Sequence, residues 1–125
     1  MKKILIVDDD RDILELMAYI LGEEDYQTLT LDNGDAILEE ISRFKPDLIL
    51  MDVMLEHLDG RDICHLIKRM EATRSLPVIL VSASHDLSER LGREGAPDDF
   101  LSKPFELETL LHKVRSTLQK RQVTS

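Results

Sequence analysis

The amino-acid sequence predicts a doubly wound α/β fold, in which a parallel β-sheet lies between two layers of helices. Short apolar runs alternate with helix-like segments five times along the chain, and repeated strand–helix units form parallel sheets with right-handed crossovers. Residues 48–51 are four consecutive apolar residues, the pattern of a central strand that is buried on both faces. This run ends abruptly in Asp52, at the edge of the sheet where open α/β proteins bind ligands.

Each strand and helix follows from its local pattern. Gly22 supplies a common C-terminal signal for the first helix, and the second helix ends before Pro46, since the residue ahead of a proline disfavours the helical conformation. The fourth helix has only Leu87 and Leu91 as an apolar pair, so we expect it to be short and mobile. The predicted strands cover residues 3–7, 26–31, 47–52, 78–81 and 99–102, and the predicted helices cover residues 10–22, 35–44, 60–70, 86–94 and 106–120.

Composition limits the classes of function that need to be considered. The 125 residues are 42% hydrophobic and 33% charged, which is ordinary for a soluble globular domain with one core. A formal net charge of −9 argues against nucleic-acid binding by this chain, because such binding needs a basic face. Cys64 is the only cysteine, so a disulfide framework is excluded and a cytoplasmic location is expected. The first apolar run ends at once in three aspartates, unlike a signal peptide, and no run approaches a membrane span.

Five side chains with useful chemistry follow the predicted strands. The C-terminal ends of parallel strands lie at one edge of a sheet, which would gather Asp8 and Asp9 from the first strand, Asp52 from the third, Ser82 from the fourth and Lys103 from the fifth. The three carboxylates and the ammonium group carry a net charge of −2, and carboxylates without compensation repel one another. One Mg²⁺ ion would cancel this charge and suits oxygen ligands, whereas zinc would require softer ligands.

Asp52 is the candidate catalytic nucleophile of this site. A carboxylate can attack phosphorus and form an aspartyl phosphate, while Lys103 holds the phosphoryl oxygens and the Ser82 hydroxyl donates to one of them. The alternative is structural, because an aspartate in the position of Asp52 can also cap a helix or end a strand in solvent. The joint placement of these residues at four strand ends favours phosphoryl transfer.

Five ordered motifs occur at spacings typical of one protein family. They are Ile-Leu-Ile-Val before Asp8 and Asp9, Pro46-Asp47 with the apolar run that leads to Asp52, Leu58-Asp59-Gly60, Pro77 with the run that leads to Ser82, and Lys103-Pro104-Phe105. With these motifs the chain resembles the CheY-like receiver domain of two-component response regulators over essentially its full length. The resemblance implies a flavodoxin-like (βα)5 fold with strand order 2-1-3-4-5. The receiver domain would span residues 1–121, and residues 122–125 would form a polar, frayed tail.

The resemblance also implies which residues bind the metal ion. Asp9, Asp52 and the backbone carbonyl of Met54 would bind Mg²⁺ directly, and Asp8 would bind it through a water molecule. In the loop that follows Asp52, the family usually has proline where this chain has Glu56, so we expect a looser loop that the Asp59-Gly60 turn closes.

The resemblance also implies roles for Lys103 and for two switching positions, Ser82 and Phe100. Lys103 would pair with the phosphoryl group, and its peptide bond to Pro104 would be cis. Ser82 stands where the family has Thr or Ser. Phe100 stands where a switching aromatic, often Tyr, turns inward on activation; without a hydroxyl group its signal would be steric.

The implied partners are those of a phosphorylation-dependent signalling module. A histidine kinase or histidine phosphotransfer protein would donate the phosphoryl group, and a downstream effector or output domain would bind the switched form. The domain would be a monomer or a weak dimer through the face of the fourth helix, fifth strand and fifth helix. The domain would not be an enzyme that acts on a separate substrate, since it would catalyse only its own Mg²⁺-dependent phosphorylation and dephosphorylation.

Two other functions remain as alternatives. A phosphatase of the haloacid-dehalogenase type would need a second aspartate where this chain has Met54. A pseudo-receiver would signal by partner binding alone, and the intact set of Asp9, Asp52, Ser82 and Lys103 argues against it.

Overall fold

Five parallel strands form the central sheet in the part of the chain that the computed structural model describes, residues 1–83 and 95–124. Their order across the sheet is β2-β1-β3-β6-β7, and every neighbouring pair is parallel. Numbered within this sheet alone, the order is 2-1-3-4-5, which confirms the predicted flavodoxin-like topology. The strands are β1 (Lys3–Val7), β2 (Gln27–Leu31), β3 (Leu48–Asp52), β6 (Val78–Ser82) and β7 (Asp99–Ser102).

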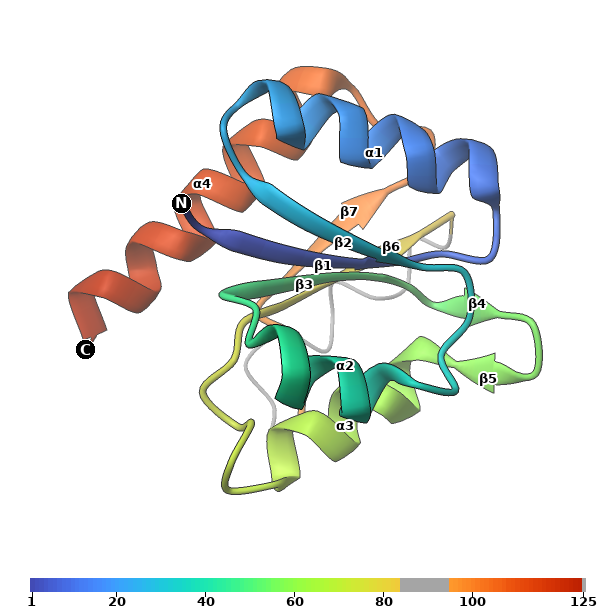
Figure 1. The fold of residues 1–125 in the computed structure, drawn as a ribbon, viewed down its shortest axis with the longest axis vertical. Coiled ribbons are helices and arrows are strands. Elements are labelled where there is room, and N and C mark those ends of the chain that lie inside the picture. Colours follow the sequence, from blue (N-terminus) through green and yellow to red (C-terminus); the bar gives the residue numbers. More distant parts are fainter. Residues whose placement is uncertain (84–94, 125) are drawn as a thin grey trace.

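Two of the described helices cover each face of the sheet (Figure 1). α1 (Arg11–Glu23) and α4 (Leu107–Thr124) lie on one face, and α2 (Ile37–Phe44) and α3 (Gly60–Arg69) lie on the other. The layers therefore follow in the predicted order of helix, sheet and helix. The helix predicted at residues 86–94 lies outside the described residues.

The last helix is longer than its apolar stripe indicated. α4 continues to Thr124, so the predicted helix end at residue 120 was wrong. Residues 119–122 are Gln, Lys, Arg and Gln, whose intrinsic helix propensity favours a longer helix. None of the described helices combines the length and the apolar composition needed to cross a membrane.

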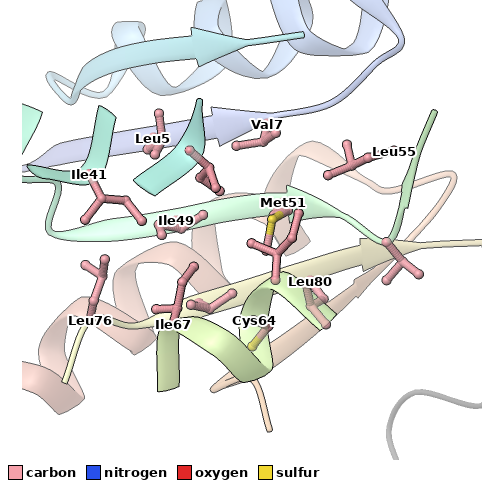
Figure 2. Close-up of a cluster of buried hydrophobic side chains, with 14 residues drawn as sticks. Leu5, Val7, Ile41, Ile49, Met51, Leu55, Cys64, Ile67, Leu76 and Leu80 are labelled. Carbon is pink, nitrogen blue, oxygen red and sulfur yellow. The ribbon is translucent and has the colours of Figure 1, made fainter. Parts of the chain in front are cut away.

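The core divides into one apolar cluster on each face of the sheet. Figure 2 shows the cluster between the sheet and helices α2 and α3, which contains Leu5 and Ile49 of the strands and Ile67 of α3. The opposite cluster contains Ile4 and Leu110, and it packs the sheet against α1 and α4. Successive residues of a strand point to opposite faces, so β3, buried at all five positions, requires the continuous apolar run seen in the sequence.

A small hairpin occupies the segment between β3 and α3, which was expected to be a loose loop. β4 (Met54–Leu55) pairs in antiparallel fashion with β5 (Leu58–Asp59). The Leu55 side chain is 2% exposed and belongs to the cluster shared with α2 and α3. Leu55 therefore anchors the hairpin to the core.

α3 begins at Gly60, as predicted, and Asp59 precedes it as the last residue of β5. The Asp59 carboxylate accepts a hydrogen bond from the N–H of Arg61 at 2.8 Å and caps the helix. The N–H of Gly60 donates to the carbonyl of Val53 at 2.7 Å. A Cβ atom at residue 60 would lie 2.3 Å from the carbonyl oxygen of Asp52, so only glycine lets α3 begin this close to the end of β3.

Candidate functional site

The register of the sheet brings Asp8 and Asp52 to the same edge. Val7 of β1 is paired with Met51 of β3, so the residue that follows each of them reaches the C-terminal edge beside the other. Asp8 is 0% exposed and Asp52 is 7% exposed. Two carboxylates with so little access to water need a compensating charge.

Lys103 supplies part of that charge. Its Nζ lies 3.0 Å from Oδ2 of Asp8 and 3.0 Å from Oδ2 of Asp52. The backbone N–H of Lys103 donates to the carbonyl of Ser82 at 2.9 Å, which holds the end of β7 against β6. The peptide bond from Lys103 to Pro104 is cis, as the resemblance implied. One ammonium group therefore bridges two buried carboxylates.

Burial and hydrogen bonding shift the pKa values of this group. Burial raises the pKa of the Asp8 carboxyl above its usual value, and hydrogen bonds from the Asp10 N–H and from Lys103 offset this only in part. Burial by itself would lower the pKa of Lys103, but the hydrogen bonds to Asp52 and Asp8 outweigh it, so the pKa of the ammonium group is raised. The lysine thus stays charged, while negative charge on Asp8 remains costly.

Asp9 completes a group of three carboxylates. One carboxylate oxygen from each of Asp8, Asp9 and Asp52 lies within 4.8 Å of the others. With Lys103 the described residues of this group carry a net charge of −2. Three hard oxygen donors at this spacing and with this charge fit an octahedral Mg²⁺ ion, whose ligands lie at about 2.1 Å.

The remaining predicted site residues lie around this group. Ser82 is the last residue of β6, the strand next to β3, and it is buried. The backbone N–H of Met54 donates to Oδ1 of Asp52 at 3.2 Å, while the Met54 side chain is 76% exposed. Phe100 lies in β7, is half-buried and packs against the apolar cluster shared with α2 and α3. Ser82 and Met54 therefore border the carboxylates, and Phe100 is placed in the sheet.

Besides the N–H of Met54, two backbone donors at the site were not identified from the sequence. The N–H of Asp10 donates to Oδ1 of Asp8 at 2.9 Å, and the N–H of Glu56 donates to Oδ2 of Asp9 at 3.2 Å. The side chain of Asp10 also caps α1, and an aspartate ahead of a helical pattern is the usual signal for that role. Residue type does not indicate where a main-chain N–H will donate, so the contact from Glu56 to Asp9 could be found only once the hairpin was known.

The sequence of this chain is similar to those of known proteins. Residues 4–115 match the response regulator receiver domain family. The DNA-binding response regulator MtrA of Mycolicibacterium paratuberculosis is 32% identical over 120 residues, which cover 95% of this chain and 52% of that protein. The chain spans about half the length of the curated relatives it matches.

Solved structures of similar chains have the same fold. A putative response regulator from Chloroflexus aurantiacus superposes with a TM-score of 0.86 at 31% identity, covering 94% of this chain and 98% of that one. The signal receiver domain of a signal transduction histidine kinase from Syntrophus aciditrophicus superposes with a TM-score of 0.85 at 33% identity, covering 96% and 92%. Both similarities extend over almost the whole of each chain.

Proposed function

Because this chain belongs to the response regulator receiver domain family of two-component systems, we propose that phosphorylation of Asp52 switches its binding to a partner. The family is one of signalling domains rather than of enzymes with a separate substrate. The observation that carries the proposal is the position of Lys103 Nζ, 3.0 Å from both Asp8 and Asp52, beside a third carboxylate.

The proposed reaction transfers a phosphoryl group from a histidine kinase or a histidine phosphotransfer protein. A bond forms between a carboxylate oxygen of Asp52 and phosphorus, and the bond between phosphorus and the imidazole nitrogen of the donor breaks, leaving its electron pair on that nitrogen. Lys103 would follow the phosphoryl oxygens, because it already lies beside the attacking carboxylate. The Ser82 hydroxyl would donate to a phosphoryl oxygen.

Mg²⁺ is the proposed cofactor of this reaction. Asp9, Asp52 and the backbone carbonyl of Met54 would be its direct ligands, and Asp8 would bind it through water. When bound, the ion would supply positive charge to the transferring phosphoryl oxygens. The net charge of −2 among the described residues of the site supports a divalent cation.

Partner binding is proposed to change on the face formed by β7, α4 and the helix predicted at residues 86–94. Phe100 in β7 would contribute sterically, and the same face would support a weak dimer of an otherwise monomeric domain. The effector or output domain and the cytoplasmic location are likewise proposals. DNA binding is named for MtrA, a protein about twice as long as this chain, and the net charge of −9 argues against DNA binding by this chain itself.

Intact-mass spectrometry after incubation with acetyl phosphate and Mg²⁺ tests the proposed function. We expect the mass of one added phosphoryl group on the wild-type chain, none on Asp52→Asn, and none when a chelator removes the metal. A gain that persists in Asp52→Asn would assign the acceptor elsewhere. A folded wild-type chain that gains no mass would favour the pseudo-receiver alternative.

A further inference from the structure

The three carboxylates of the site are held by different donors. Lys103 Nζ donates to both Asp8 and Asp52, and a backbone N–H also supports each of those two. Within residues 1–83 and 95–124, the N–H of Glu56 is the sole donor to the carboxylate of Asp9, at 3.2 Å from Oδ2. Asp9 is also the exposed member of the three. One main-chain hydrogen bond therefore restrains the carboxylate with the greatest freedom to turn away.

The geometry of the hairpin makes this N–H available. Leu55 pairs with Leu58, so Glu56 and His57 form a two-residue turn between them. The N–H of the first residue in such a turn takes no part in the strand ladder. Since Leu55 is buried in the core, the hairpin is anchored and presents the N–H of Glu56 to the end of β1.

We propose that Glu56 is a positioning residue, whose backbone N–H orients Asp9 and thereby sets the affinity of the site for Mg²⁺. This inference rests on the proposed function and assigns a part of it to the hairpin. Oδ2 of Asp9 accepts the hydrogen bond, which leaves Oδ1 for the metal ion. The restraint removes conformational freedom from Asp9 before the ion arrives, so less freedom is lost on binding. Hydrogen-bond partners of metal ligands typically change metal affinity by about tenfold or more.

Proline at residue 56 would remove this donor with little other change. The described residues with positive φ are Asp25, Lys45 and Gly95, so residue 56 lies outside the positive-φ region, which would exclude proline. Leu55 is extended in β4, the conformation favoured ahead of a proline. Glu56→Gln is the matched control, because both substitutions remove the carboxylate and only proline also removes the N–H.

Isothermal titration of metal-free protein with MgCl₂ measures the proposed effect. We expect Glu56→Gln to weaken Mg²⁺ binding by less than about threefold, and Glu56→Pro to weaken it by about a further tenfold. Equal affinities of the two folded variants would overturn the inference while the metal site stands. If the wild-type chain does not bind Mg²⁺, or if Asp9→Ala binds it equally well, the proposed metal site is overturned and the inference with it.

A second measurement needs no proline. In ¹⁵N-labelled metal-free protein, Asp9→Ala should accelerate the hydrogen exchange of the Glu56 amide and move its proton resonance upfield, because the acceptor is lost. Asp9→Ala that leaves both quantities unchanged would contradict the inference even if Glu56→Pro does not fold.

Discussion

Two lysine–aspartate groups stand at opposite edges of the same sheet and differ in their balance of charge. At the N-terminal edge, Lys68 Nζ donates to Oδ2 of Asp98 at 2.6 Å and to the carbonyl of Leu76 at 2.8 Å. The same oxygen of Asp98 accepts from the N–H of Val78 at 2.8 Å. One ammonium group meets one carboxylate, and main-chain groups complete the hydrogen bonding of both.

At the C-terminal edge, one ammonium group serves a larger negative charge. Lys103 is shared between Asp8 and Asp52. A carboxylate oxygen of Asp9 lies within 4.8 Å of an oxygen of each of these two aspartates. The neutral group joins α3 to the starts of β6 and β7, whereas the other group retains a charge of −2 that only a further cation can cancel. The same two residue types thus form a balanced ion pair at one edge and a group with excess negative charge, a candidate cation site, at the other.

The largest expected effect is that of Lys103→Met, which removes the ammonium group shared by Asp8 and Asp52. Asp8 and Asp52 would keep their backbone N–H donors but lose the positive charge that balances them, so we expect the free energy of unfolding of metal-free protein to fall by about 3 kcal/mol or more. Urea denaturation at neutral pH measures this, and added Mg²⁺ should recover part of the loss. A metal-free variant as stable as the wild type would show that the two carboxylates need no lysine.

Lys68→Met should have a smaller effect at the opposite edge. It leaves the carbonyl of Leu76 without its side-chain donor, but Asp98 keeps the N–H of Val78 and access to water. We expect a loss of about 1 to 2 kcal/mol in the free energy of unfolding, and an unchanged affinity for Mg²⁺. A change in Mg²⁺ affinity would contradict the separation of the two edges.

Asp8→Asn tests the effect of burial on Asp8 through the pH dependence of the free energy of unfolding. Because burial raises the pKa of Asp8 above its usual value of 3.8, the folded protein binds this proton more tightly than the unfolded chain does. Asp8 therefore contributes stability that is fully present below the unfolded value and is lost as pH rises through the folded pKa. In urea denaturation without metal, the stability of the wild type relative to Asp8→Asn should fall as the pH rises above about 4. A relative stability that instead rises with pH would refute the burial effect.

The smallest expected effect is that of Arg11→Ala, which removes an ion pair near the site that is open to water. Arg11 contacts Asp32 at 2.9 Å, but their side chains are 78% and 40% exposed. We expect the free energy of unfolding to change by about 0.5 kcal/mol or less, because solvent screens such pairs. A loss of stability as large as that of Lys68→Met would show that the exposure of an ion pair does not decide how much it contributes to the free energy of unfolding.

The sequence by itself determined the layers, the strand ends and the identity of the charged group. A strand buried on both faces must be apolar throughout, so β3 was recognisable, and Asp52 at its end was placed with it. Asp8 and Lys103 followed in the same way, because parallel strands bring their C-terminal ends to one edge whatever the details of packing.

Only the tertiary structure decided how those charges are shared and how the segment after Asp52 is held. Lys103 contacts Asp8 and Asp52 and not Asp9, which depends on side-chain positions that no periodicity encodes. A hairpin with the buried Leu55 stands where a loop was expected, and Gly60 approaches the end of β3. These outcomes depend on contacts between residues distant in sequence and on main-chain donors, and a main-chain N–H is the same in every residue except proline.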